Sequence, residues 1–218
     1  MIISNSKNFI FIHIDKCGGN SVKDALQPYL NKNDILIGSL DFNETEQDLY
    51  YLEKYKLRRH STAKEIKKIV KNNWETMYKF TTVRNPLDIM ISLYFYVEKN
   101  LKEDVDDEYF TIYKKSLENK KPIDFFIKYL IENKYSCTVP ITSRIDDSVE
   151  IFDIDNIEEN WNYILKKINI IDNVKINKLN KSNRPTNVYL EKETKDLIYD
   201  CFMVDYQTIP KITKYKWN

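Results

Sequence analysis

The pattern of apolar and polar positions predicts strands that alternate with helices. Residues 9–14 form a continuous run in which only His13 is polar, as is typical of a strand buried on both faces of a parallel sheet. Residues 78–83 and 149–152 predict two more strands. A helical pattern with Val22, Ala25 and Leu26 on one face follows the first strand and ends near Pro28.

Helix signals recur along the rest of the chain. Thr62 and Glu65 have the spacing of a capping box that begins a helix running to Val70. Asn85 and Pro86 suit the cap and first turn of a helix after the second strand. Further helices are predicted at residues 122–133, 156–168 and 190–202, and the polar residues 100–121 predict a solvated helical excursion.

This alternation predicts a three-layer α/β fold with a central, mostly parallel sheet flanked by helices. The chain has 218 residues, of which 42% are hydrophobic, enough for a substantial core. Its sequence contains no repeat and no linker-like segment, so residues 1–218 are expected to form a single domain. The 34 basic and 33 acidic side chains nearly cancel, which argues against a nucleic-acid partner.

Cysteines and apolar runs indicate the expected compartment. Cys17, Cys137 and Cys201 are odd in number and far apart, so a reduced interior is expected rather than a disulfide framework. With only two histidines and no zinc-ligand spacing, no metal site is expected. The apolar run near the N-terminus is too short for a signal peptide or a membrane span. We therefore expect a cytoplasmic protein.

The first candidate site is the turn between the first strand and its helix. Two adjacent glycines allow a tight turn whose N–H groups can point at an anion, and the helix adds the positive end of its dipole. The alternative is a plain turn with a solvated lysine. No Walker A spacing occurs anywhere, which disfavours ordinary ATP or GTP hydrolysis. The candidate anion-binding residues are Lys16, Cys17, Gly18, Gly19, Asn20 and Ser21.

The second candidate site follows the second strand. Arg84 stands where that strand ends, at the rim where open α/β sheets bind ligands. Ser92 lies about two helical turns further on, so both side chains can reach one phosphate held against this helix. The alternative is a surface ion pair for Arg84 and a hydroxyl bonded within the helix for Ser92.

Together the two sites resemble the superfamily of sulfotransferases that use 3′-phosphoadenylyl sulfate (PAPS). Within it, the chain is most similar to the carbohydrate-type family that includes the heparan and chondroitin sulfotransferases. Residues 11–21 resemble the family's P-loop-like 5′-phosphosulfate loop, and residues 80–94 resemble its 3′-phosphate motif. Weaker likeness at residues 149–161 and 179–185 extends the resemblance over nearly the whole chain.

The resemblance implies a PAPS co-substrate and a role for each matching residue. Lys16 would stabilise the leaving oxygen, while the backbone of residues 17–21 and the Ser21 hydroxyl would hold the 5′-phosphate. Arg84 and Ser92 would bind the 3′-phosphate, with Arg184 on a basic loop over it. Asp15, Cys17 and Asn20 depart from the family's usual residues, and Asp15 would be unfavourable near the ligand unless it points away. Cys17 next to a lysine has the setting of a reactive thiol, but a buried thiol is preferred.

His60 matches the place where the family often has its catalytic base, just before the capped helix. A histidine can take the proton of the acceptor hydroxyl as the bond to sulfur forms. The alternative is that His60 is an exposed loop histidine without a catalytic role. The base would then be a carboxylate, with Glu44, Glu46 and Asp48 as candidates. His13, inside the strand run, is expected to be a core histidine with satisfied hydrogen bonds.

The resulting hypothesis is a sulfotransferase that moves the sulfuryl group from PAPS to a hydroxyl of a small molecule or glycan, without a metal. Two alternatives stay open at this point. A kinase-like phosphotransferase would use ATP, and a non-catalytic nucleotide-binding protein would bind without reaction. The sequence does not identify the acceptor.

Overall fold

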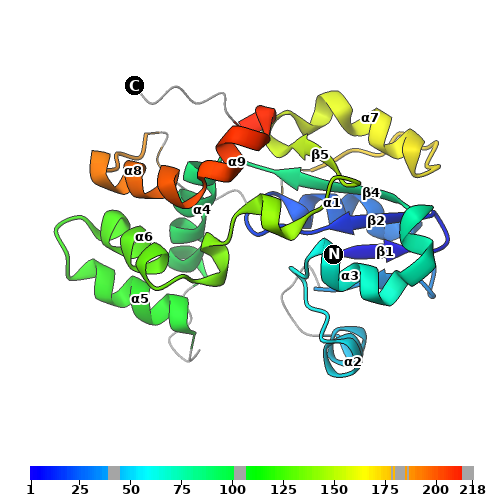
Figure 1. Ribbon diagram of the computed structural model, residues 1–218, viewed down its shortest axis with the longest axis horizontal. Coiled ribbons are helices and arrows are strands. Elements are labelled where there is room, and N and C mark those ends of the chain that lie inside the picture. Colours follow the sequence, from blue (N-terminus) through cyan, green and yellow to red (C-terminus); the bar gives the residue numbers. More distant parts are fainter. Residues whose placement is uncertain (39–44, 101–106, 178, 180–184, 186, 213–218) are drawn as a thin grey trace. The chain divides into compact units, whose positions relative to one another are not determined.

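The computed structural model of the protein describes residues 1–38, 45–100, 107–177, 179, 185 and 187–212. Its residues group into two compact units (Figure 1). The first unit comprises Met1–Val83 and Ile141–Leu179. The second comprises Arg84–Pro140 and Asn180–Asn218.

A five-stranded sheet forms the centre of the first unit, in the order β3-β1-β2-β4-β5. β2, β4 and β5 pair in parallel, whereas β1 is antiparallel to both β2 and β3. Only β1 therefore runs against the others, and the predicted mostly parallel sheet is confirmed. The strands are β1 (Ile2–Ser4), β2 (Phe9–Ile12), β3 (Ile35–Leu36), β4 (Tyr78–Val83) and β5 (Glu150–Asp153).

Helices cover both faces of this sheet, as predicted for a three-layer fold. Successive side chains of a strand point to opposite faces. Phe9 and Phe11 accordingly join a core with α1 and α7, while Ile10 and Ile12 join a second core with α3. Figure 1 shows α7 and α3 on opposite sides of the sheet. The helices of this unit are α1 (Gly19–Leu26), α2 (Glu46–Tyr55), α3 (Ala63–Val70) and α7 (Ile157–Lys167), with 3-10 turns at Gln27–Tyr29, Lys71–Glu75, Ile141–Arg144 and Ile154–Asn156.

The second unit is helical in the part that the structure describes. The ring of Tyr94 contacts those of Tyr113 and Phe126, which joins α4, α5 and α6. The carboxylate of Asp124 accepts hydrogen bonds from the Thr194 hydroxyl at 2.6 Å and the Glu191 N–H at 2.9 Å, which ties α6 to α8. The elements are α4 (Pro86–Lys99), α5 (Glu108–Leu117), α6 (Pro122–Glu132), α8 (Lys192–Cys201) and α9 (Met203–Thr208), with 3-10 turns at Ser136–Thr138 and Pro210–Ile212.

Local signals predicted most of these elements. The capping box of Thr62 and Glu65 is present at the start of α3, and Asn85 caps α4 with Pro86 in its first turn. The helix predicted within 100–121 is confirmed as α5, but its predicted solvation is wrong, because α5 buries Phe110, Ile112 and Tyr113. Residues 101–106 of this range lie outside the described residues. β1, β3 and α2 were not predicted from the sequence, although the spacing of Thr45 and Asp48 is that of the capping box found at the start of α2. The two strands are only three and two residues long, which is too short for a periodic pattern.

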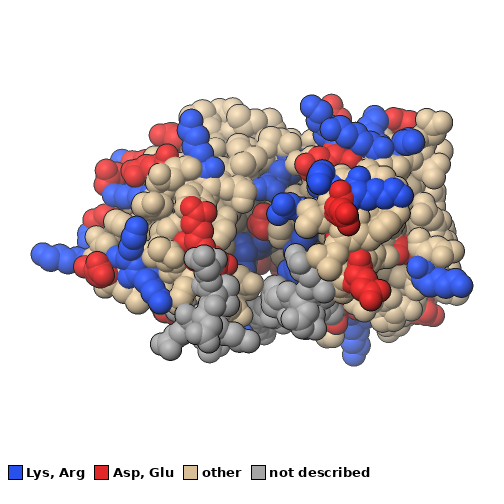
Figure 2. Space-filling model, turned by 90° about the horizontal axis from the view of Figure 1, so that it is seen from below, with Lys and Arg blue, Asp and Glu red and all other residues tan. Residues whose placement is uncertain are grey.

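The surface agrees with the nearly neutral composition. Figure 2 shows Lys and Arg interspersed with Asp and Glu over the face that it presents. Among the described residues, no helix combines the length and the apolar character that a membrane span requires.

Candidate functional site

The predicted anion-binding loop joins the end of β2 to the start of α1 through an unusual backbone path. Lys16 has φ 57° and Gly18 has φ 75°, so both lie in the left-handed region. Glycine adopts this conformation without steric cost, whereas a lysine there must be held by its surroundings. Gly18 occupies the N-cap position of α1, and no described side chain caps that helix.

Each glycine of the loop is required by a close neighbour. A Cβ at Gly18 would overlap the side chain of Ile154, and its positive φ would also be strained. A Cβ at Gly19 would overlap the imidazole of His13. The glycine pair thus brings the loop close to the end of β2 on one side and to the turn after β5 on the other.

Hydroxyl groups on β4 bond the end of β2 and the loop that follows it. Thr81 donates to the Ile12 carbonyl at 2.7 Å, and Thr82 donates to the Cys17 carbonyl at 2.7 Å. Both threonines are fully buried, so these bonds are shielded from water. Cys17 is also fully buried, which agrees with the predicted buried thiol rather than a reactive one.

The first turn of α1 presents donors that an anion can accept. The N–H groups of Ser21 and Val22 both bond the Gly18 carbonyl. Those of Gly19 and Asn20 have no partner among the described residues, as is usual for the first turn of a helix. The Ser21 hydroxyl oxygen accepts from the Leu179 N–H at 3.0 Å, which leaves the hydroxyl proton able to donate. This is the arrangement that binds phosphate at helix N-termini.

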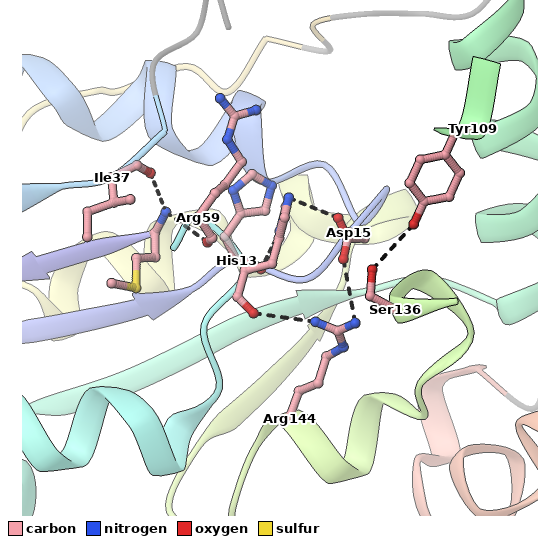
Figure 3. A network of polar contacts seen from close by, with 9 residues as sticks. His13, Asp15, Ile37, Arg59, Tyr109, Ser136 and Arg144 are labelled. Atoms are coloured by element: carbon pink, nitrogen blue, oxygen red, sulfur yellow. Dashed lines mark hydrogen bonds and ion pairs between the residues drawn. The ribbon is translucent and has the colours of Figure 1, made fainter. Parts of the chain in front are cut away.

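A charged group next to the loop contains His60, Asp15 and Arg144. His60 Nε2 lies 2.9 Å from Asp15 Oδ1. Arg144 approaches the same carboxylate, with its Nη2 3.6 Å from Asp15 Oδ2, and its Nη1 donates to the His60 carbonyl at 3.4 Å. Figure 3 shows the side chains of Asp15 and Arg144 directed toward each other. Asp15, whose charge was expected to be unfavourable, is thus paired with cations.

Hydrogen bonding fixes the protons of the His60 ring. Its Nδ1 lies 2.9 Å from the His13 carbonyl, which can only accept, so Nδ1 must donate. A carboxylate also only accepts, so in contact with ionised Asp15 the Nε2 must donate as well. His60 therefore carries a proton on both ring nitrogens in this arrangement. The assignment follows from the partners of the ring.

The Asp15 carboxyl is stabilised in its ionised form. Burial raises its pKa, but the hydrogen bond from His60 and the charges of His60, Arg144 and Lys16 outweigh burial, so the pKa lies below its ordinary value. The carboxylate is therefore the form of Asp15 that meets His60 and Arg144.

The ring of His13 contacts the ring of His60, with centroids 4.6 Å apart in an edge-on arrangement. Burial, followed by the nearby charge of His60, lowers the pKa of His13 well below its ordinary value, so its ring is neutral. His13 is buried as predicted. The expectation of satisfied hydrogen bonds is wrong for its Nδ1, which has no partner within the described residues.

The predicted 3′-phosphate residues belong to the second unit. Arg84 directly follows the last residue of β4 and is half-buried. Ser92 is half-buried on α4, about two turns after the cap, where the Asn85 side chain accepts from the Leu87 N–H at 2.9 Å. Arg184 lies outside the described residues. The structure therefore places Arg84 and Ser92 in the second unit, whereas the other described site residues belong to the first: Lys16, Cys17, Gly18, Gly19, Asn20, Ser21 and His60.

The carboxylates proposed as substitutes for His60 have different surroundings. Asp48 is buried and accepts from the N–H groups of Thr45 and Gly38, at 2.9 and 2.5 Å, so its role is structural. Glu46 is exposed in the first turn of α2, and Glu44 lies outside the described residues. Within the described residues, no three His, Cys, Asp or Glu side chains gather as they would around a metal ion.

Sequence reasoning missed two members of the charged group. Arg144 stands 84 positions from His60, and no local motif marks it. Asp15 was noticed only as a departure from a family pattern. A charged residue where the family usually has a neutral one was the only signal in the sequence that could have indicated an ion pair.

The chain is similar to a family of known proteins and to a solved structure. The family model described as the sulfotransferase family matches residues 1–209. Among curated proteins none matches the chain significantly. Among solved structures, the chain is similar to mouse sulfotransferase SULT7A1 complexed with PAP, with 13% identity and a TM-score of 0.36. That match covers 99% of this chain and 70% of the other, and it is too distant to transfer any property to this protein.

Proposed function

Because the chain belongs to the sulfotransferase family, we propose that it transfers the sulfuryl group of PAPS to a hydroxyl of a carbohydrate. The observation that carries this proposal is the loop between β2 and α1. There, the N–H groups of Gly19 and Asn20, which have no partner in the described part of the chain, and the Ser21 hydroxyl lie at a helix N-terminus beside Lys16. Such a loop suits the 5′-phosphosulfate end of the donor.

In the proposed reaction, the hydroxyl oxygen of the acceptor attacks sulfur in line with the departing nucleotide. The O–H bond breaks and its proton passes to Nε2 of His60, once that atom holds a lone pair. The new O–S bond forms while the bond from sulfur to the bridging oxygen breaks. The electron pair stays on that oxygen, so 3′-phosphoadenosine 5′-phosphate (PAP) leaves, and Lys16 stabilises the developing charge. Fixed donors of this kind are expected to supply the largest part of catalysis.

We assign recognition of the 3′-phosphate to Arg84 and Ser92, with Arg184 as a further cation. The support is the spacing of Arg84 and Ser92 around the start of α4, together with the resemblance of residues 80–94 to a 3′-phosphate motif. The carbohydrate acceptor rests on the resemblance of both motifs to carbohydrate sulfotransferases.

Thermal unfolding with added nucleotides tests the donor. PAP is expected to raise Tm more than AMP, and more than ATP with Mg²⁺, because only PAP carries the 3′-phosphate. A preference for ATP with Mg²⁺ would point to a phosphotransferase instead.

Mass spectrometry then tests the acceptor. The enzyme and PAPS are incubated separately with glycans and with phenols, and products heavier by one sulfuryl group are identified. Sulfated glycans support the proposal. Products from phenols alone would keep the reaction but reject the carbohydrate. Nucleotide binding without any product would indicate a binding protein.

A further inference from the structure

The surroundings of His60 leave a single ring atom for catalysis. Nδ1 is committed to the His13 carbonyl, which holds the ring by a backbone group that no side-chain replacement removes. Nε2 is therefore the ring atom that can accept a proton from a substrate. In the structure, Asp15 Oδ1 stands 2.9 Å from this same atom.

This contact differs from the usual pairing of a catalytic histidine with a carboxylate. In a Ser-His-Asp triad the carboxylate bonds one nitrogen and the other nitrogen takes the proton. Here the backbone carbonyl occupies the orienting position and the carboxylate meets the reactive nitrogen. A hydroxyl and Asp15 thus compete for Nε2, because a ring nitrogen makes one in-plane hydrogen bond.

We propose that Asp15 is a positioning residue that orients the His60 ring and occupies Nε2 in the resting enzyme. His60 then acts as a base only when the contact between Asp15 and Nε2 breaks. The proposal rests on the proposed function, with His60 as the base.

The proton balance is simple. The resting imidazolium first releases its Nε2 proton to solvent, and neutral His60 then takes the proton of the acceptor hydroxyl. The imidazolium that results pairs again with the Asp15 carboxylate, which stabilises it.

Two consequences with opposite signs follow. A nearby carboxylate favours the imidazolium, so Asp15 delays the appearance of the active base as pH rises. The same carboxylate stabilises the imidazolium formed by proton transfer, so it raises the rate once the base is available. Replacement of Asp15 should therefore raise the transfer rate at low pH and lower it at high pH.

Other charged groups bear on the same ring and must be counted. His13, beneath the ring, is neutral because it is buried. Arg144 contacts both partners of the pair and disfavours an additional positive charge. Further charged groups that act on Asp15 or on His13 are Lys16 from the loop, Lys23 from α1, Arg59 and the Met1 amine.

The experiment combines a rate profile with a spectroscopic measurement on the full chain. The variants are Asp15→Asn, Asp15→Glu and Arg144→Gln, with Asp147→Asn as the control. Asp147 is exposed in the same unit and stands 87 positions from His60 in the sequence, so its replacement also removes one carboxylate. Single-turnover transfer is measured from acid to alkaline pH, and ¹⁵N chemical shifts of the His60 ring are measured without substrates.

For Asp15→Asn, the acid limb of the rate profile should move to lower pH, because the carboxylate that favours the imidazolium is gone. The alkaline plateau of kcat should fall by up to about tenfold, with little change in KM. Asp15→Glu should restore much of the parental profile. Arg144→Gln should move the limb in the opposite direction, because it removes a positive charge. Asp147→Asn should leave the profile unchanged.

The nitrogen shifts separate this proposal from the proposed function. Near neutral pH, the parent should show protons on both ring nitrogens and Asp15→Asn should show a proton on Nδ1 alone. This readout needs no activity, so it holds even if the chain transfers no sulfuryl group. Identical ring spectra in parent and Asp15→Asn would overturn the proposal. A rate profile of Asp15→Asn that superimposes on that of Asp147→Asn would do the same.

Discussion

The imidazole of His13 occupies the space that a side chain at Gly19 would need. This relationship links the end of β2 to the first residue of α1, and it explains the second glycine of the loop by packing. The same histidine offers its carbonyl to His60, so one residue contacts both the loop and the candidate base.

Gly19→Ala is expected to lower the free energy of unfolding by about 1–3 kcal/mol, because the new methyl group overlaps a buried ring. In the His13→Ala background the same change should cost much less, since the ring is gone. Urea unfolding of the four proteins in this cycle measures the coupling. Asp24→Ala, further along α1, serves as the control. Additive effects of the two changes would show that His13 does not constrain Gly19.

Lys23 on α1 should give the protein a stability that rises in mildly alkaline solution. Its side chain is fully buried and donates to the Gly38 carbonyl. Burial, helped by the charge of Arg59 and opposed by that of Asp48, lowers the pKa of Lys23 to about 8, against 10.5 for an exposed lysine.

Between these two values the unfolded chain holds one more proton than the folded chain, so raising the pH favours folding. We expect the free energy of unfolding to rise from about pH 8 to about pH 10.5, by at most about 1.4 kcal/mol per pH unit. Lys23→Met should remove this slope, measured as the difference between parent and variant in denaturant unfolding. Equal slopes would mean that Lys23 keeps an ordinary pKa.

Arg84→Ala should weaken binding of PAP far more than binding of adenosine 5′-phosphosulfate, which lacks the 3′-phosphate. A charge-assisted bond to phosphate is strong, and only one of the two ligands offers it. Calorimetry measures both affinities, with exposed Arg58→Ala as the control for loss of a positive charge. Equal losses for the two ligands would remove Arg84 from recognition of the 3′-phosphate.

Lys16→Ala should reduce kcat more than it reduces PAP binding. The reason is that Lys16 is expected to meet charge that develops mainly in the transition state. Single-turnover rates and PAP affinity are compared with those of Lys64→Ala, an exposed lysine of α3. A normal rate in correctly folded Lys16→Ala would exclude the lysine from the chemistry.

His60→Ala should bind PAP like the parent but transfer the sulfuryl group at least about a hundredfold more slowly, because a general base contributes roughly 10²–10⁴-fold. Transfer with a known acceptor measures the rate, and calorimetry measures the binding. Near-parental transfer would assign the base to a carboxylate, for which Glu46 is the exposed candidate in α2.

Much of the fold was predictable because it depends on local patterns. Apolar runs marked β2, β4 and β5, and capping residues marked the starts of α3 and α4. These signals act within a few residues, so they are legible in one sequence. The short strands β1 and β3 were missed because their stability comes from pairing with neighbours rather than from a pattern of their own.

The candidate site divides in the same way. By itself, the sequence predicted the candidate anion-binding loop, since glycine spacing and a following helix are properties of adjacent residues. Only the tertiary structure decided that Asp15 meets His60 and that Arg144, 84 positions from His60, completes the group. It also decided that Gly19 must be a glycine, because the ring that excludes a side chain reaches it through the turn from β2. Ion pairs and close packing depend on where the fold brings distant atoms, and no local pattern records that.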